Sequence, residues 1–185
     1  MSSDSEEENM VDVAIAIAAV KEISLKPSLD TGQGTGDCLL EASISQFHMR
    51  PNLGHLLNFK NQDCRKYTVD ILEESERAFN LYSIQDGGKS GSKIKQWKRD
   101  CRQLRQPGKY NCMAGDLMPL ALAARLGRNI LVINTHVTSC NVMLTVHLAA
   151  TLGGKAIDNC PILLCYDGNH YEGLCPLTDE DEGKI

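Results

Sequence analysis

The chain has 185 residues, of which 42% are hydrophobic and 5% aromatic, and its formal net charge is −5. The length suits one domain, because a single core usually serves about 100–200 residues, and the apolar content excludes a wholly disordered chain. The acidity lies at the ends, since residues 1–9 carry −4 and residues 176–185 carry −3, so we expect a folded domain over 10–176 between an acidic leader, 1–9, and an acidic tail, 177–185.

The first apolar run is Val11–Val20, which we interpret as part of a helix over about 10–26. The run follows acidic residues, whereas a secretory signal begins with basic ones. It is also too short to cross a bilayer, which takes about 20 residues. The sequence therefore predicts a cytoplasmic or nuclear protein without membrane contact, in which the 8 Cys residues stay reduced.

Helices are expected to continue through the first two thirds of the chain. In order, the predicted segments are a Gly- and Pro-rich loop at 27–36, a helix from 37, a connection at 48–59, a helix at 62–82, a loop at 86–92, and helices at 93–105 and 116–126. The last helix is predicted to begin at Asp116 as N-cap and to end at Gly127.

Three of these helices have an apolar stripe that predicts the buried face. The stripes are Leu40, Ile44 and Phe47 on the first, Cys64, Tyr67, Ile71 and Ala78 on the second, and Ile94, Trp97, Cys101 and Leu104 on the third.

Strands are predicted in the last third of the chain. Residues 129–134, 142–147 and 161–166 are rich in β-branched and apolar side chains, and the turn at 167–169 leads into a hairpin partner at 170–174. This order of elements predicts an α+β fold, with helices packed around a small, mostly antiparallel sheet.

The cysteines could be apolar core residues, metal ligands or a reactive nucleophile. No two are separated by two residues, and the nearest pair, Cys160 and Cys165, has no histidine partner at zinc-site spacing. We predict no metal and no other cofactor.

Cys38 is the candidate nucleophile, because it follows a glycine loop and begins a helix. The free N–H groups and the dipole of a helix N-terminus favour a thiolate. Such a thiol needs a base, which is near in space but distant in sequence. His170, after a buried strand and a tight turn, is the candidate.

Three segments resemble the ovarian tumour (OTU) family of cysteine proteases, in that family's order. They are GTGDCLLEASISQF, similar to its cysteine block, AGDLMPLALAARLGRNILVIN, similar to its central block, and PILLCYDGNHYEGL, similar to its histidine block. The resemblance spans about residues 31–175 and implies a papain-like fold.

The resemblance implies an isopeptidase that removes ubiquitin or a ubiquitin-like modifier from lysine through a thioester. Cys38 matches the nucleophile and His170 the general base, while backbone N–H groups around Gly36, Asp37 and Cys38 match the oxyanion site. Glu172 matches the third catalytic position, where the family often has Asp or Asn, and a backbone or Asn group is the alternative.

One departure supports a second hypothesis, a catalytically weak or inactive ubiquitin-binding module. The family usually has Asp three residues before the cysteine, where this chain has Thr35. The non-standard Glu172 points the same way.

The segment 89–109 holds eight Lys and Arg residues against one Asp, a net charge of +7. It is interpreted first as a solvated helix face, with a modifier-binding surface and a contact with the acidic tails as alternatives. Its single Trp97 gives no aromatic pattern for base stacking, so we expect no nucleic-acid partner.

Overall fold

The computed structural model describes residues 25–27, 37–49, 61–85, 90–110, 112–134, 143–155 and 161–176. Its elements are β1 (Leu25–Pro27), α2 (Cys38–Met49), α3 (Asn61–Glu74), α4 (Glu76–Gln85), α5 (Ser90–Leu104), the 3-10 helix η2 (Met113–Leu117), α6 (Met118–Leu126), β2 (Ile130–Asn134), β3 (Met143–His147), the 3-10 helix η3 (Ala149–Leu152), β4 (Ile162–Tyr166) and β5 (Tyr171–Pro176). None of these helices is long and apolar enough to cross a membrane. Most of the predicted helix at 10–26, the loop residues Thr35 and Gly36, and both acidic tails lie outside the described residues.

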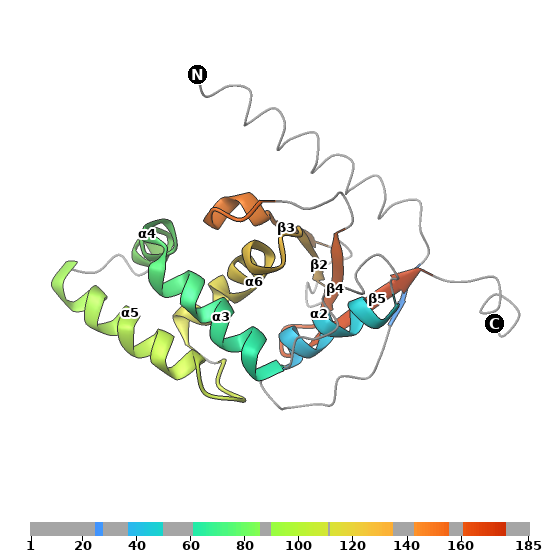
Figure 1. The fold of residues 1–185 in the computed structure, drawn as a ribbon, viewed down its shortest axis with the longest axis horizontal. Coiled ribbons are helices and arrows are strands. Elements are labelled where there is room, and N and C mark those ends of the chain that lie inside the picture. The colour runs from blue at the N-terminus through green and yellow to red at the C-terminus, as the bar shows by residue number, and fades with distance from the viewer. Residues whose placement is uncertain are drawn as a thin grey trace, which may run out of the picture.

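The five strands form one sheet in the order β1-β5-β4-β2-β3. Three of its four pairings are antiparallel, and β2 pairs with β4 in parallel. Figure 1 shows the sheet at the right of the molecule, α4 and α5 at the left, and α3 and α6 between them. The predicted α+β class, with helices around a mostly antiparallel sheet, is confirmed.

Side chains alternate between the two faces of this sheet, as the pleat requires. Ile130, Val132 and Leu164 lie in the main core together with residues of the helices. Their neighbours Leu131 and Leu163 lie in a second, smaller cluster. The continuous apolar runs predicted for these strands therefore serve two buried faces, as strands covered on both sides do.

The predicted helix at 62–82 is two helices, α3 and α4, which meet at Ser75. The Ser75 hydroxyl accepts a hydrogen bond from the Ala78 N–H at 3.1 Å, which is the bond of an N-cap residue. Tyr67, which the stripe predicted as buried, is 43% exposed. The stripe is confirmed for Cys64 and Ala78, which are buried, and the buried face of α3 runs from Cys64 through Thr68 and Leu72.

In α5 the stripe prediction is confirmed for Trp97, Cys101 and Leu104 but is wrong for Ile94, which is 47% exposed near the start of the helix. The prediction missed a buried carboxylate, Asp100, which is 2% exposed.

Both carboxylate oxygens of Asp100 accept hydrogen bonds, one from α4 and one from α5. The Tyr82 hydroxyl donates to Oδ2 at 3.0 Å, and the Gln96 amide donates to Oδ1 at 2.7 Å. The Tyr82 ring also packs against Trp97, with centroids 4.9 Å apart. Asp100 is tolerated in the core because its lone pairs are used, and it joins α4 to α5.

Two predicted helix boundaries also differ. Asp116 is not an N-cap, because it lies inside η2, and α6 begins after Leu117 with no side-chain cap. Residues 25 and 26, predicted as the end of a helix, pair with β5 in a strand. Gly127, with φ of 60°, ends α6 as predicted.

We expect Tyr82→Phe to lower the free energy of unfolding by about 1.5–3 kcal/mol, because it leaves a buried carboxylate short of one hydrogen bond. Tyr67→Phe is the matched control, since Tyr67 is exposed, and it should change stability by less than about 0.5 kcal/mol. Urea denaturation measures both values. Equal effects of the two substitutions would contradict the role given to the Tyr82–Asp100 bond.

Candidate active site

Cys38 is the first residue of α2, as predicted. The Asp37 carbonyl accepts hydrogen bonds from the N–H groups of Leu40 at 2.9 Å and Glu41 at 3.0 Å, which closes the first turn. Leu39 is 1% exposed, whereas Cys38 is half-buried, so the helix is anchored in the core just beyond the thiol. The N–H groups of Cys38 and Leu39 have no place in the i→i−4 ladder and are available near the sulfur.

The side chain of Asp37 holds this helix start in place. It forms an ion pair with Arg65 of α3, and its Oδ2 accepts a hydrogen bond from the Gly108 N–H at 3.1 Å. The prediction considered only the backbone N–H of Asp37, and it missed this side-chain role. The other predicted oxyanion residue, Gly36, lies outside the described residues.

Arg65 is 2% exposed, and its guanidinium contacts three segments of the chain. Besides the Asp37 carboxylate, it donates to the carbonyl oxygens of Leu104 at 2.8 Å and Lys109 at 3.0 Å. The planar fork of donors in an arginine suits such a set of partners. Arg65 therefore joins α3 to the start of α2, to the end of α5 and to the turn that follows α5.

Cys38 also lies against the start of β5. Burial raises the pKa of its thiol, while the N–H groups of Tyr171 and Leu39 lower it without offsetting the burial. The N–H at the helix start lowers the thiol pKa, as expected, but burial, which the prediction did not consider, raises it by more. The sulfur needs a proton acceptor to become a nucleophile.

His170 directly precedes Tyr171, so the fold brings residues from opposite ends of the described chain together. The backbone of His170 is held by the predicted turn. Asp167 Oδ1 accepts from the N–H groups of Asn169 and His170, both at 2.8 Å, and the Asp167 N–H donates to the His170 carbonyl at 3.3 Å. Gly168 adopts φ of 100° at the centre of the turn, a conformation that favours glycine.

Glu172 lies on β5 opposite Cys165 of β4, and it is half-buried. Partners in an antiparallel register share a face of the sheet, and so do residues two apart on a strand. Glu172 therefore shares its face with Leu174, while Tyr171 faces the main core. Its role as the third catalytic residue stays a prediction.

Three tyrosines near the thiol were not predicted as site residues. The rings of Tyr166 and Tyr171 stack with centroids 4.4 Å apart, and Tyr110 meets Tyr171 edge-on at 6.4 Å. Burial, together with the nearby Tyr166, Cys38 and Asp116, raises the pKa of Tyr171 to about 12, although the Tyr110 side chain lowers it. The signal in the sequence was the tyrosine at each end of the 167–169 turn, since these two form a cross-strand pair.

These groups can act as a nucleophile, a base and backbone donors. Within the described segments, no group of three or more His, Cys, Asp or Glu side chains could hold a metal ion. Of the other cysteines, Cys64 and Cys101 are buried core residues as predicted.

No family model and no curated protein matches the chain. Solved structures with a similar fold include OTU domains, the family that the three sequence blocks resemble. The OTU domain of OTUD1 is 17% identical, with 77% of this chain and 81% of that chain covered and a TM-score of 0.47. A viral OTU domain protease from Dera Ghazi Khan virus is 11% identical, covering 84% and 87%, with a TM-score of 0.49. An OTU deubiquitinase from Wolbachia pipientis wMel is 9% identical, covering 88% and 95%, with a TM-score of 0.46.

We expect Arg65→Met to lower the free energy of unfolding by about 2–4 kcal/mol, since it removes the cation paired with the partly buried Asp37 carboxylate and the side-chain donor to two backbone carbonyls. Arg77→Met on the exposed face of α4 is the matched control and should cost less than about 0.5 kcal/mol. Urea denaturation measures both, and a small loss for Arg65→Met would contradict its anchoring role.

Proposed function

We propose that the protein is a cysteine-dependent isopeptidase that removes ubiquitin or a ubiquitin-like modifier from lysine. The observation that carries this proposal is that α2, which begins at Cys38, packs against β5, which begins one residue after His170. A half-buried thiol at a helix start beside a histidine-bearing strand is the arrangement that thiol-dependent acyl transfer uses. The three sequence blocks supply the substrate class, because they resemble OTU proteases.

In the proposed reaction, His170 takes the proton of the Cys38 thiol as the sulfur attacks the carbonyl carbon of the modifier's C-terminal glycine. The tetrahedral intermediate then collapses to a thioester, and His170 returns the proton to the leaving lysine amine. Water, deprotonated by His170, attacks the thioester and releases the modifier as a carboxylic acid with the free thiol. Glu172 is proposed to orient the imidazole.

The developing oxyanion needs donors that are already in place. In this proposal the backbone N–H groups at the start of α2 supply them, together with Gly36 and Asp37 of the preceding loop. Support comes from the first turn of α2, where the Asp37 carbonyl accepts the N–H groups of Leu40 and Glu41 and leaves the earlier ones unused in the helix ladder.

A ubiquitin carrying a C-terminal electrophile should label the wild-type protein and fail to label Cys38→Ala. Cys112→Ala is the matched control, because Cys112 is also half-buried but lies on another segment, and it should label like the wild type. Gel shift and mass spectrometry of the labelled peptide provide the readout. Labelling that survives Cys38→Ala would rule out Cys38 as the nucleophile.

The pH dependence of alkylation tests His170 as the base. Thiolate forms as pH rises through the thiol pKa, and burial raises that pKa above the ordinary 9.0. In the wild type, alkylation of Cys38 by iodoacetamide should therefore keep rising beyond pH 9.0, and in His170→Ala, which lacks the proposed proton acceptor, it should rise at a still higher pH. The cleavage rate of His170→Ala should fall about 10²–10⁴-fold. Identical pH profiles would exclude His170.

The second candidate function is an OTU-like ubiquitin-binding module with little turnover. Thr35 and Glu172, which depart from the family pattern, favour it. A panel of di-ubiquitin linkages, run beside a binding titration with ubiquitin, separates the two functions. Binding with no cleavage of any linkage, and without electrophile labelling, would favour the module.

A further inference from the structure

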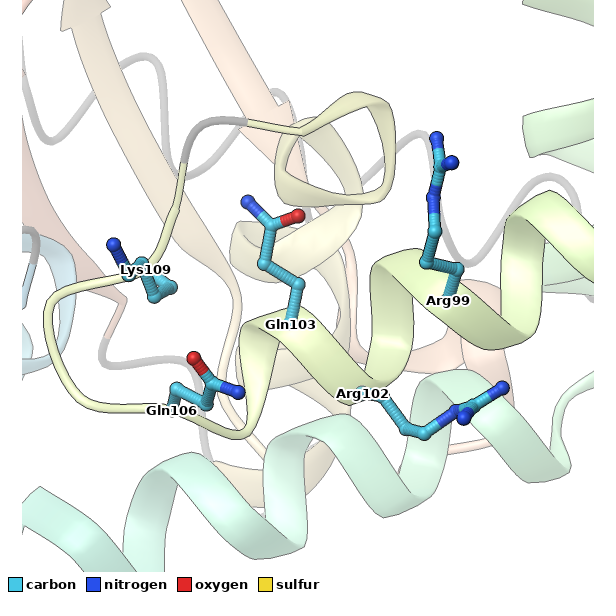
Figure 2. A pocket seen from close by; sticks show the side chains of 5 residues that line it. All are labelled: Arg99, Arg102, Gln103, Gln106 and Lys109. Carbon is cyan, nitrogen blue, oxygen red and sulfur yellow. The ribbon is translucent and has the colours of Figure 1, made fainter.

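A basic surface lies on α5 and the turn that follows it. We define it by the five residues that line a hollow of about 560 Å³: Arg99, Arg102, Gln103, Gln106 and Lys109. In Figure 2 the side chains of Arg99 and Gln103 extend to one side of α5, Arg102 extends along the other, and Gln106 and Lys109 lie on the turn. We propose that this basic surface binds an acidic polypeptide segment of the protein from which the modifier is removed. This inference rests on the proposed isopeptidase function.

The charges of the basic surface are not balanced within the described part of the chain. Arg105, close by, shows the contrast, because it pairs with Asp70 and Glu73 at 2.6 Å each. No described carboxylate lies within ion-pair distance of Arg102 or Lys109. These cations remain open to an external anion.

Arg99 has one carboxylate near it, which is already in use. Its Nε lies 3.9 Å from Asp100 Oδ1, and its side chain is 70% exposed. That oxygen accepts a hydrogen bond from Gln96 at 2.7 Å, and Asp100 is buried. The Arg99 guanidinium therefore faces solvent with most of its donors available.

The lining favours a polypeptide as the partner over a nucleic acid. Gln106 offers an amide that can both donate and accept, which suits a peptide backbone, whereas phosphates only accept. None of the five lining residues is aromatic, so the surface offers no platform for base stacking.

The shape of the surface suits an extended segment. A second hollow of about 450 Å³ shares Arg99 and Gln103 with the first and continues past Gln96 to Ser92. The two hollows together follow α5 over several turns, so an extended chain could lie along them. Its carboxylates would meet Arg99, Arg102 and Lys109 of the first hollow, because the second adds no cation and is lined by Asp100.

The basic surface adjoins the candidate active site through the turn after α5. The Lys109 carbonyl accepts a hydrogen bond from Arg65, and the Gly108 N–H donates to Asp37, the residue before Cys38. A segment bound along α5 would therefore belong to the molecule that is presented to Cys38. The surface would favour conjugates whose modified protein is acidic near the linked lysine.

The test is binding of a fluorescein-labelled peptide of alternating Glu and Gly to the full chain carrying Cys38→Ala, measured by anisotropy. The basic-surface variant combines Arg99→Gln, Arg102→Gln and Lys109→Gln. The matched control combines Lys66→Gln, Arg77→Gln and Lys155→Gln, which removes the same charge from exposed positions elsewhere.

We expect the basic-surface variant to bind the peptide about tenfold more weakly, as the loss of three exposed ion pairs predicts, and the control to change by less than about twofold. Added salt should weaken the wild-type interaction. Absence of binding, or an equal loss in both variants, would overturn the proposal. An oligonucleotide of equal charge that binds more tightly than the peptide, and is lost in the basic-surface variant, would also overturn it.

The peptide assay does not depend on turnover, so its failure can be told apart from failure of the proposed function. Electrophile labelling of Cys38 without peptide binding would keep the isopeptidase and remove the basic surface. Peptide binding without labelling would remove the isopeptidase and keep the basic surface as a binding site for acidic peptides. The proposal that the peptide belongs to the modified protein would then fall.

Discussion

The buried ion pair between Arg65 and Asp37 is the interaction on which the site depends. Two charges in a protein interior are costly unless their remaining donors and acceptors are used. Here they are used, since the guanidinium also bonds to two carbonyls at the end of α5 and the carboxylate also accepts from Gly108. The pair therefore fixes the start of α2 against α3 and α5, and with it the position of Cys38 in front of β5.

A second constraint follows from where that helix start is placed. The neighbours that hold Cys38 in position also remove it from water, and the loss of water disfavours a thiolate more than the nearby N–H groups favour it. A thiol in such a place is stable and unreactive by itself. The reactivity of this thiol then depends on a proton acceptor nearby.

Local signals in the sequence predicted the strands β2 to β5, the turn before His170, the helix start at Cys38 and the end of α6 at Gly127. Each of these depends on residues that are close along the chain. The errors came from contacts between distant residues. Arg65 and Asp100 are charged, so their burial could not be read from an apolar stripe, and the partners of Arg65 lie in segments 28 to 44 positions away. The break at Ser75 was the exception, since a local serine cap was present and was missed.

The order of strands has a consequence for biosynthesis. β5, the last strand, lies between β1, the first, and β4, so the sheet joins the two ends of the described chain. Cys38 is made early, while His170 and β5 are made last, and chains are synthesised from the N-terminus. A nascent chain on the ribosome therefore carries the Cys38 thiol long before β5, the strand that packs against α2, has been made. The start of α2 can therefore reach its final surroundings only after β5 has left the ribosome.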